Sequence, residues 1–284
     1  MIEILHPGIY VSIQDSGRKG MSSFGISRGG AMDFHSFSLA NSIVGNNQND
    51  ACLEVTFGGG KFLFKNETHI CLTGADFNPM INGDLVEMNN SIHIGEGDIL
   101  SFGKRKNGVY TYIGIKGGIQ SEKVLNSRSQ FKHITSKFRL EKGDHIPFDC
   151  GNNDSVKTNF QPDKVDVFDG NRIDCYPGPE FHLLNDDQKR QLTQQFRLSK
   201  NCNRIGVVLE GEIPNDFPQQ LSSGVIPGTV QLTPSGKLIV LMRDCQTTGG
   251  YPRILQLDDF SVNKLSQKFT DDYIRFSLVK QNIE

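Results

Sequence analysis

The sequence contains no hydrophobic run long enough to cross a membrane. Its apolar runs, such as Leu238–Met242, have the length of a strand, whereas a membrane-spanning helix needs about 20 consecutive apolar residues. The N-terminal residues MIEILHPG also lack the basic stretch and the long apolar segment of a secretion signal. We therefore expect a cytoplasmic protein that does not bind membranes.

Neither sign of charge is in excess. The chain has 30 basic and 32 acidic residues, which gives a formal net charge of -2. Nucleic-acid binders usually carry a surplus of positive charge that neutralises phosphates, so this balance argues against a nucleic-acid partner. With 284 residues, 36% hydrophobic and 22% charged, the composition is typical of a globular chain of one large or two modest domains.

Motifs for metal binding, nucleotide binding and thiol chemistry are missing. The six cysteines lie 19 to 79 residues apart without a C-x-x-C pair, and the seven histidines show no H-x-x-x-H spacing. The P-loop pattern G-x-x-x-x-G-K-[ST] does not occur. Cys202 and Cys245 have no neighbouring histidine that would activate a thiolate. We predict neither a metal site nor a cysteine nucleophile.

Glycine, in contrast, is abundant, and it indicates a β-rich fold. The 30 glycines separate short apolar segments, as the turns of β-proteins do. Residues 109–115 and 273–279 alternate with the period of a strand. The segments 92–102 and 138–148 each place a Gly-Asp pair between apolar runs, which predicts two hairpins.

Helices are expected in only a few places. Residues 31–44 carry an apolar stripe that ends before Gly45, Asn185 can cap a helix running to about Phe196, and a third helix is predicted near residues 258–267. The polar stretch 151–164 predicts a boundary between domains at 1–163 and 164–284. The predicted fold is mainly β with a few helices, in two β-rich domains.

The first candidate site lies near the N-terminus. A strand over residues 9–13 would deliver Gln14, Asp15 and Arg18 into a turn, and the motif Gly29-Gly30-Ala31-Met32-Asp33 follows. An arginine can clamp a carboxylate or phosphate, a nearby aspartate can orient it or act as a base, and glycines expose backbone donors. An Asp–Arg pair that braces an ordinary loop is the alternative.

The second candidate site lies in the C-terminal half. Asn203 and Arg204 form one part, and the run Arg243–Pro252 follows a strand predicted at Leu238–Met242. Its neutral side chains and its Gly249-Gly250 pair could hold an amide or stabilise an oxyanion. The alternatives are a polar strand-to-turn segment and an arginine that forms a surface ion pair.

A series of segments, in this order along the chain, resembles the KipA family, also called allophanate hydrolase subunit 2 or the biotin-dependent carboxyltransferase-like family. The resemblance runs from Pro7 to Ile254. It rests on PGIYVSIQDSGRKG, GGAMDFHSFSLANSIVGN, ACLEVTFGGG, CLTGADFNPMING, YIGIKGGI, CNRIGVVLEG and IPGTVQLTPSGKLIVLMRDCQTTGGYPRI.

The resemblance implies a cyclophilin-like β-barrel in the C-terminal domain. It also implies the role of the C subunit of an ATP-dependent 5-oxoprolinase, which opens 5-oxo-L-proline to L-glutamate together with A and B subunits, the B subunit being KipI-like. One alternative is a carboxyltransferase for urea or a related amide. Since no M-K-M-like segment occurs, carboxybiotin would come from another protein. Another alternative is a non-catalytic antagonist of a KipI-like kinase inhibitor.

Combined with this resemblance, the two candidate sites give a set of expected roles. ATP would be used by the complex, and the substrate would be a small polar amide. We expect catalytic roles for Asp15, Arg18, Arg204, Gln246 and Thr247, and substrate contacts from Gln14, Gly29, Gly30, Asp33, Asn203, Thr248, Gly249, Gly250 and Tyr251.

Overall fold

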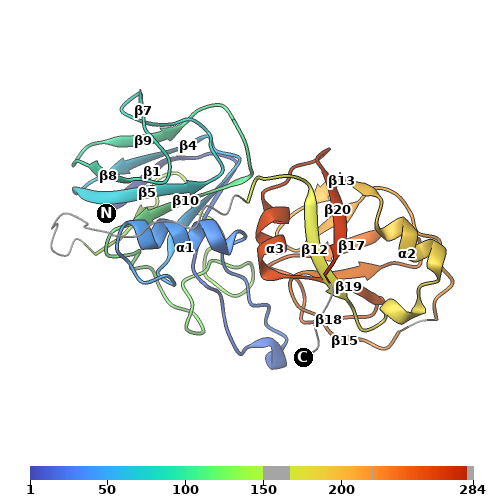
Figure 1. Cartoon of the computed structure of the whole chain (residues 1–284). Helices are drawn as coiled ribbons and strands as arrows, with labels where there is room; N and C mark the ends of the chain where they lie inside the picture. The colour runs from blue at the N-terminus through green and yellow to red at the C-terminus, as the bar shows by residue number, and fades with distance from the viewer. Residues whose placement is uncertain (150–166, 219, 280–284) are drawn as a thin grey trace. The chain divides into compact units, whose positions relative to one another are not determined.

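The computed structural model describes residues 1–149, 167–218 and 220–279 (Figure 1). Two compact units are present. Unit 1 consists of Met1–Arg18 and Gly29–Asp166, and unit 2 of Lys19–Arg28 and Val167–Glu284. The predicted boundary near residue 163 and the polar stretch 151–164 lie outside the described residues. A division into two consecutive ranges does not anticipate that residues 19–28 belong to unit 2.

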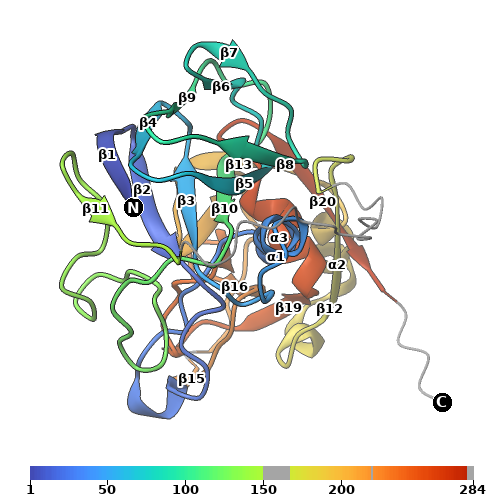
Figure 2. The ribbon, with the colours of Figure 1, turned by 90° about the vertical axis from the view of Figure 1, so that its left-hand side faces the viewer.

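The described part of unit 1 contains two antiparallel sheets and one α-helix (Figure 2). The six-stranded sheet has the order β11-β1-β4-β9-β6-β7, and the five-stranded sheet has the order β2-β3-β10-β5-β8. The elements are β1 (Ile2–Pro7), β2 (Tyr10–Gln14), α1 (Phe34–Ile43), β3 (Cys52–Thr56), β4 (Gly60–Phe64), β5 (Thr68–Gly74), β6 (Pro79–Ile81), β7 (Asp84–Leu85), β8 (Ser91–Ile94), β9 (Ile99–Phe102), β10 (Tyr110–Ile115) and β11 (His145–Ile146).

Both sheets of unit 1 contribute to one apolar core. Ile2 and Phe62 come from the six-stranded sheet, Leu53 and Ile70 come from the five-stranded sheet, and all four are fully buried in the same cluster. Burial of this alternating apolar face supplies the main driving force for pairing the sheets. The ends of β2 and the loop after β10 are thereby held on a rigid scaffold.

Helix α1 begins three residues later than the predicted range 31–44. Asp33 is its N-cap, since its side chain accepts a hydrogen bond from the Ser36 backbone N–H at 3.0 Å. Residues 31–32 therefore lead into the helix rather than form its first turn. At the other end, Gly45 has a φ of 76°, as expected for a residue that terminates a helix.

The two segments with a Gly-Asp pair are not hairpins, so that prediction was wrong. Strand β8 pairs with β5 in one sheet, whereas β9 pairs with β4 in the other. In the segment 138–148, the structure assigns only β11 as a strand. The turns themselves are alike: Asp98 and Asp144 each accept a hydrogen bond from the backbone N–H three residues earlier. The Gly-Asp pair thus specifies a turn, but it does not decide which strands pair.

Unit 2 is built on a closed seven-stranded barrel of order β12-β19-β16-β17-β14-β13-β20, with a separate two-stranded sheet β15-β18 (Figure 1). Its elements are the short 3-10 helix η1 (Ser22–Phe24), β12 (Arg172–Pro177), η2 (Phe181–Leu183), α2 (Asp186–Leu192), β13 (Gln195–Cys202), β14 (Gly206–Leu209), β15 (Ser223–Gly224), β16 (Thr229–Leu232), β17 (Leu238–Leu241), β18 (Thr248–Gly249), β19 (Arg253–Leu257), α3 (Asp259–Ser266) and β20 (Tyr273–Leu278).

The predicted helices of unit 2 are present. Asn185 caps α2 through a capping box with Gln188, and Asp258 caps α3. Helix α2 ends at Leu192, before the predicted limit, because Phe196 lies in β13 and packs against Phe276 of the neighbouring strand β20. The mainly β fold with few helices and a C-terminal barrel is confirmed. None of the described helices is long and apolar enough to span a bilayer.

Candidate functional site

The carboxylate of Asp15 holds the loop 127–129 in place. Its Oδ1 accepts hydrogen bonds from the Ser127 and Ser129 hydroxyls at 2.7 and 2.6 Å and from the Gly17 N–H at 2.8 Å. Its Oδ2 accepts from the Arg128 N–H at 2.6 Å. Only 8% of Asp15 is exposed, so the residue is buried with its acceptors occupied by neutral donors. This geometry is typical of a carboxylate that holds a loop in place, and not of a general base.

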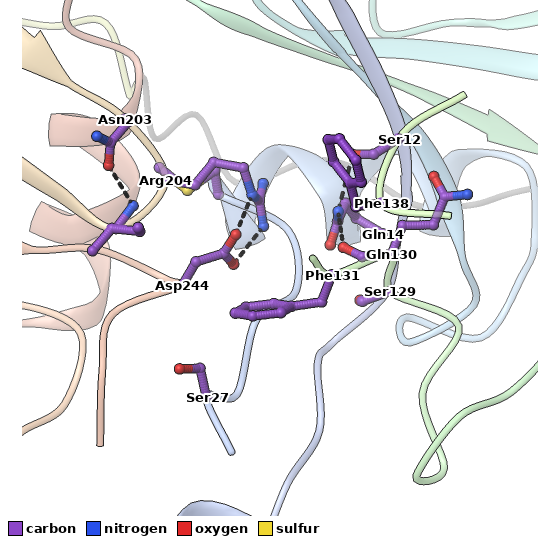
Figure 3. Close-up of polar contacts among 12 residues, drawn as sticks. Ser12, Gln14, Ser27, Ser129, Gln130, Phe131, Phe138, Asn203, Arg204 and Asp244 are labelled. Atoms are coloured by element: carbon purple, nitrogen blue, oxygen red, sulfur yellow. Dashed lines mark hydrogen bonds and ion pairs between the residues drawn. The ribbon is translucent and has the colours of Figure 1, made fainter. Parts of the chain in front are cut away.

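Gln14 and Arg18 lie on the same side of unit 1 as this loop. The Gln14 Nε2 donates to Ser12 Oγ at 2.9 Å and to the Gln130 carbonyl at 3.2 Å (Figure 3), whereas its buried Oε1 has no hydrogen-bond partner among the described residues. Arg18 is only 1% exposed and donates to the Ser129 carbonyl at 2.5 Å. The structure thus gathers Gln14, Asp15 and Arg18 around one loop, and it favours a bracing role for Asp15 and Arg18.

Gly30 makes a close backbone contact beside Asp15. Its φ is 94°, and a Cβ atom there would lie 2.9 Å from the Gly17 nitrogen and 3.0 Å from the Asp15 carbonyl oxygen. Ala31 donates its N–H to the same carbonyl at 3.0 Å. A side chain at position 30 would therefore force this turn apart. Gly29, with a φ of 64°, precedes it.

Asp33 belongs to a second buried network, which includes a glutamate and a tyrosine that sequence reasoning missed. The Tyr112 hydroxyl donates to Glu54 Oε2 at 2.7 Å and accepts from the Asp33 N–H at 2.8 Å. The Met32 N–H also donates to Glu54 Oε2. Burial, followed by the negative charges of Glu54 and Asp33, raises the pKa of Tyr112 well above its usual value, so the phenol stays protonated. This network fixes the start of α1.

Arg204 of unit 2 forms a two-pronged ion pair with Asp244, an aspartate that sequence reasoning did not single out. Arg204 Nε lies 2.7 Å from Asp244 Oδ2, and Nη2 lies 2.9 Å from Oδ1 (Figure 3). The side chains are 13% and 14% exposed, so the pair is shielded but still reaches the surface. The signal for Asp244 was its position three residues after the end of the mostly buried strand β17, next to Arg243.

The residues around this pair are held by local hydrogen bonds. Asn203 Oδ1 accepts from the N–H groups of Ile205 and Gly206, which fixes the turn that carries Arg204. The Asp244 N–H donates to the Arg204 carbonyl. Ser27, from the 19–28 segment, donates its hydroxyl to the Cys245 carbonyl at 2.6 Å. Unit 2 therefore brings Asn203, Arg204 and the start of the 243–252 run together.

The remaining predicted residues form an accessible edge of unit 2. Gln246, Thr248, Gly250 and Tyr251 are exposed, and β18 pairs with β15. A pocket of about 560 Å³ borders this edge, with Phe217, Pro218, Pro234 and Tyr251 among its lining residues. The edge thus offers neutral polar groups next to an apolar and aromatic surface, a combination suited to a small organic ligand.

Cysteine chemistry is disfavoured in unit 2. Burial raises the pKa of Cys202 to about 11 and that of Cys245 to about 12, so both thiols are protonated near neutral pH. In the described part of the chain, no group of three or more His, Cys, Asp or Glu side chains is arranged to hold a metal ion.

The predicted site residues are divided between the units. Gln14, Asp15, Arg18, Gly29, Gly30 and Asp33 belong to unit 1, whereas Asn203, Arg204 and Gln246–Tyr251 belong to unit 2. Residues 24–278 match the family model of the carboxyltransferase domain, subdomain A and B; this range begins after Gln14, Asp15 and Arg18 and includes the other predicted site residues. The chain belongs to this carboxyltransferase-domain family.

Relatives of the chain include 5-oxoprolinase subunits and urea amidolyases. The chain is 33% identical over 274 residues to the C subunit of 5-oxoprolinase from Escherichia coli, covering 94% of this chain and 87% of that protein. The equivalent protein of Haemophilus influenzae is 31% identical, over 98% of this chain and 91% of its own length. A urea amidolyase of Lachancea kluyveri is 40% identical, but over only 45% of this chain and 7% of the enzyme.

Solved structures agree with this assignment. The urea amidolyase of Kluyveromyces lactis shares the fold with a TM-score of 0.85 at 26% identity, over 98% of this chain and 19% of that one. The protein TTHA0988 matches with the same TM-score at 25% identity, over 97% of this chain. The carboxyltransferase-domain chain described here spans only 55% of TTHA0988.

Proposed function

We propose that the chain is the C subunit of an ATP-dependent 5-oxoprolinase that opens 5-oxo-L-proline to L-glutamate. The observation that carries this proposal is the similarity to the C subunit of 5-oxoprolinase from two bacteria, over nearly the whole of both chains. The urea amidolyases are much longer, and the chain corresponds to a small part of them. The proposed partners are the A subunit of the enzyme, together with a KipI-like B subunit. The chain is expected to be inactive alone.

The chemistry of the reaction defines what such a site must supply. A lactam carbonyl is a weak electrophile, and phosphorylation of its oxygen by ATP would prepare the ring carbon for attack by water. Water adds to this carbon, the ring C–N bond breaks and the nitrogen takes a proton, which gives an acyl phosphate. A second water then hydrolyses the acyl phosphate to the carboxylate and inorganic phosphate. Catalysis of this kind requires a clamp for the substrate carboxylate and donors for the amide oxygen.

The exposed edge of unit 2 is the proposed place for the amide. Gln246 and Thr248 are exposed and offer neutral donors and acceptors, while Thr247 uses its carbonyl to accept from the Val225 N–H. Gly249, Gly250 and Tyr251 complete this edge. Arg204 is the proposed anion contact, with its orientation set by Asp244 and by the Asn203 turn.

Unit 1 is proposed to have a positioning role in the reaction. Asp15 and Arg18 are buried and tied to the loop 127–129, so we assign them to holding this loop instead of to proton transfer. Gln14, Gly29, Gly30 and Asp33 would shape the same region. Since the sequence contains no P-loop, ATP is proposed to act through the complex rather than at a nucleotide site of this chain alone.

Reconstitution tests the proposal. The chain is purified as a complex with its proposed A and B partners, and ATP-dependent release of glutamate from 5-oxoproline is measured with and without the chain. We expect release only from the complete complex. Equal release without this chain would refute an essential role, provided that gel filtration confirms the assembly in the complete sample.

A carboxyltransferase is the second candidate, because the local identity to the urea amidolyases reaches 40% over 130 residues. In this case the chain would act on urea or a related amide with carboxybiotin delivered by another protein. Biotin-dependent consumption of urea by the reconstituted system, together with no glutamate release, would favour this candidate.

A further inference from the structure

Unit 1 contains a pocket to which none of the roles above assigns a ligand. Its volume is about 360 Å³, and its floor is apolar, formed by Ile13, Leu140 and Ile146. These three side chains are at most 4% exposed, so they form a firm surface. The walls are mainly polar, and Ser121, Arg128 and Gln130 are among them. A hydrophobic floor with a few polar groups is the usual form of a small-molecule site.

Arg128 provides positive charge at the wall of this pocket. Its Nη2 donates to the side-chain oxygen of Gln120 at 2.8 Å, and its guanidinium has no carboxylate partner among the described residues. An arginine whose charge is not matched within its own fold is suited to pair with a carboxylate of a ligand.

The other charged groups of the pocket do not neutralise Arg128. Lys137 and Asp144 pair with each other at 2.5 Å, so their charges cancel locally. His145 lies 3.9 Å from Glu3, which is not part of the pocket lining. Glu122, which is also in the lining, is exposed to solvent.

Asp15 explains why Arg128 is held in position. Its carboxylate accepts hydrogen bonds from three consecutive residues, Ser127, Arg128 and Ser129, which fixes the backbone that presents the guanidinium. In the lining of the same pocket, the Ser121 Oγ is buried and has no hydrogen-bond partner within the described residues. A buried hydroxyl without a partner costs free energy, and a ligand oxygen would remove that cost.

We propose that this pocket binds a small organic carboxylate, whose carboxylate pairs with Arg128 and the Ser121 hydroxyl while its hydrocarbon part rests on Ile13, Leu140 and Ile146. The inference goes beyond the proposed function, because the pocket lies in unit 1 and includes none of the residues assigned to the amide. The carboxylate could belong to the substrate, to the product or to an effector, so the experiment compares these classes.

Binding to the purified full chain is measured by titration calorimetry without ATP or partner proteins. The probes are 5-oxo-L-proline, L-glutamate, cyclopentanecarboxylate and 2-pyrrolidinone, which has the lactam but no carboxylate. We expect at least one carboxylate to bind about tenfold or more tightly than 2-pyrrolidinone. Preference for 5-oxoproline or glutamate would identify a substrate or product site, and preference for cyclopentanecarboxylate would identify a site for another carboxylate.

Arg128→Gln should weaken carboxylate binding about tenfold or more, and Ser121→Ala should weaken it by a smaller factor. Arg139→Gln is the matched control, because Arg139 lies in the same unit but outside the pocket lining, paired with Glu141. Thermal unfolding verifies that the variants are folded. If Arg128→Gln does not fold, the binding test is made with Ser121→Ala. Unchanged binding in both pocket variants, or no carboxylate binding to the wild-type chain, would overturn the inference. This experiment measures binding to the chain alone and not glutamate release. Its result is therefore independent of the reconstitution test of the proposed function.

Discussion

Two carboxylates, Asp15 of unit 1 and Asp244 of unit 2, show how the same functional group serves different purposes. Asp15 is surrounded by neutral donors, two serine hydroxyls and two backbone N–H groups. Asp244 instead faces a guanidinium, that of Arg204, in a pair that is partly exposed. The first arrangement fixes the backbone, and the second orients a positive charge near the surface.

This difference separates charged residues that stabilise the fold from charged residues that are available to a ligand. A buried carboxylate saturated by neutral groups has little capacity left for a substrate, but its loss leaves several donors without an acceptor. Removing one partner of a partly exposed ion pair costs less folding free energy, because water can reach the charge that remains. Stability measurements and activity measurements should therefore rank the two sites in opposite orders.

The largest effect on stability is expected from Asp15→Asn. The amide would replace one acceptor oxygen with a donor facing the donors of the loop 127–129, so the free energy of unfolding should fall by about 3–5 kcal/mol. Urea denaturation followed by circular dichroism measures this loss. The control is Asp84→Asn, at an exposed position of β7 in the same unit, with an expected change of less than about 0.5 kcal/mol. Similar values for both variants would contradict the role of Asp15 in holding this loop in place.

A smaller effect is expected for the pair of Arg204 and Asp244. In a double-mutant cycle with alanine at either or both positions, we expect a coupling energy of about 1–2 kcal/mol, reduced by partial exposure. Denaturation of the four proteins under the same conditions gives this value. Strict additivity would show that the observed geometry does not stabilise unit 2.

The smallest effect on stability is expected from Gln246→Ala, although its effect on activity should be large. The side chain is exposed, so the free energy of unfolding should change by less than about 0.5 kcal/mol. Loss of a donor to the reacting amide should lower the rate of glutamate release by about 100-fold in the assembled complex. The exposed Gln195→Ala on the barrel is a control. Wild-type rates in Gln246→Ala would remove this residue from the site.

Much of the fold was predictable because local signals agreed with it. Asn185 caps α2 as expected, α3 lies within the predicted range 258–267, and the alternation at residues 109–115 corresponds to β10. The prediction of hairpins at residues 92–102 and 138–148 was wrong, because a Gly-Asp turn specifies a reversal of the chain but not the sheet to which each strand belongs. Long-range strand pairing depends on the core that the two sheets share, which no short segment encodes.

The candidate site was predictable in its residue types but not in its pairings. The run Arg243–Pro252 was recognised as polar, yet the partner of Arg204 within it emerged only from the barrel, where β14 lies beside β17. Likewise, three of the donors to Asp15, from Ser127, Arg128 and Ser129, are 112 to 114 residues away in sequence. Buried networks such as Glu54 and Tyr112 leave no local pattern, because their members lie on different strands.

The measurement that tests the central claim most directly is a titration of this chain into its two proposed partners, with glutamate release from 5-oxoproline and ATP hydrolysis followed in the same samples. The proposed function predicts that ATP-dependent release rises in proportion to the added chain and saturates when the complex is complete. Glutamate release that is independent of the added chain, in samples where the complex forms, would contradict it.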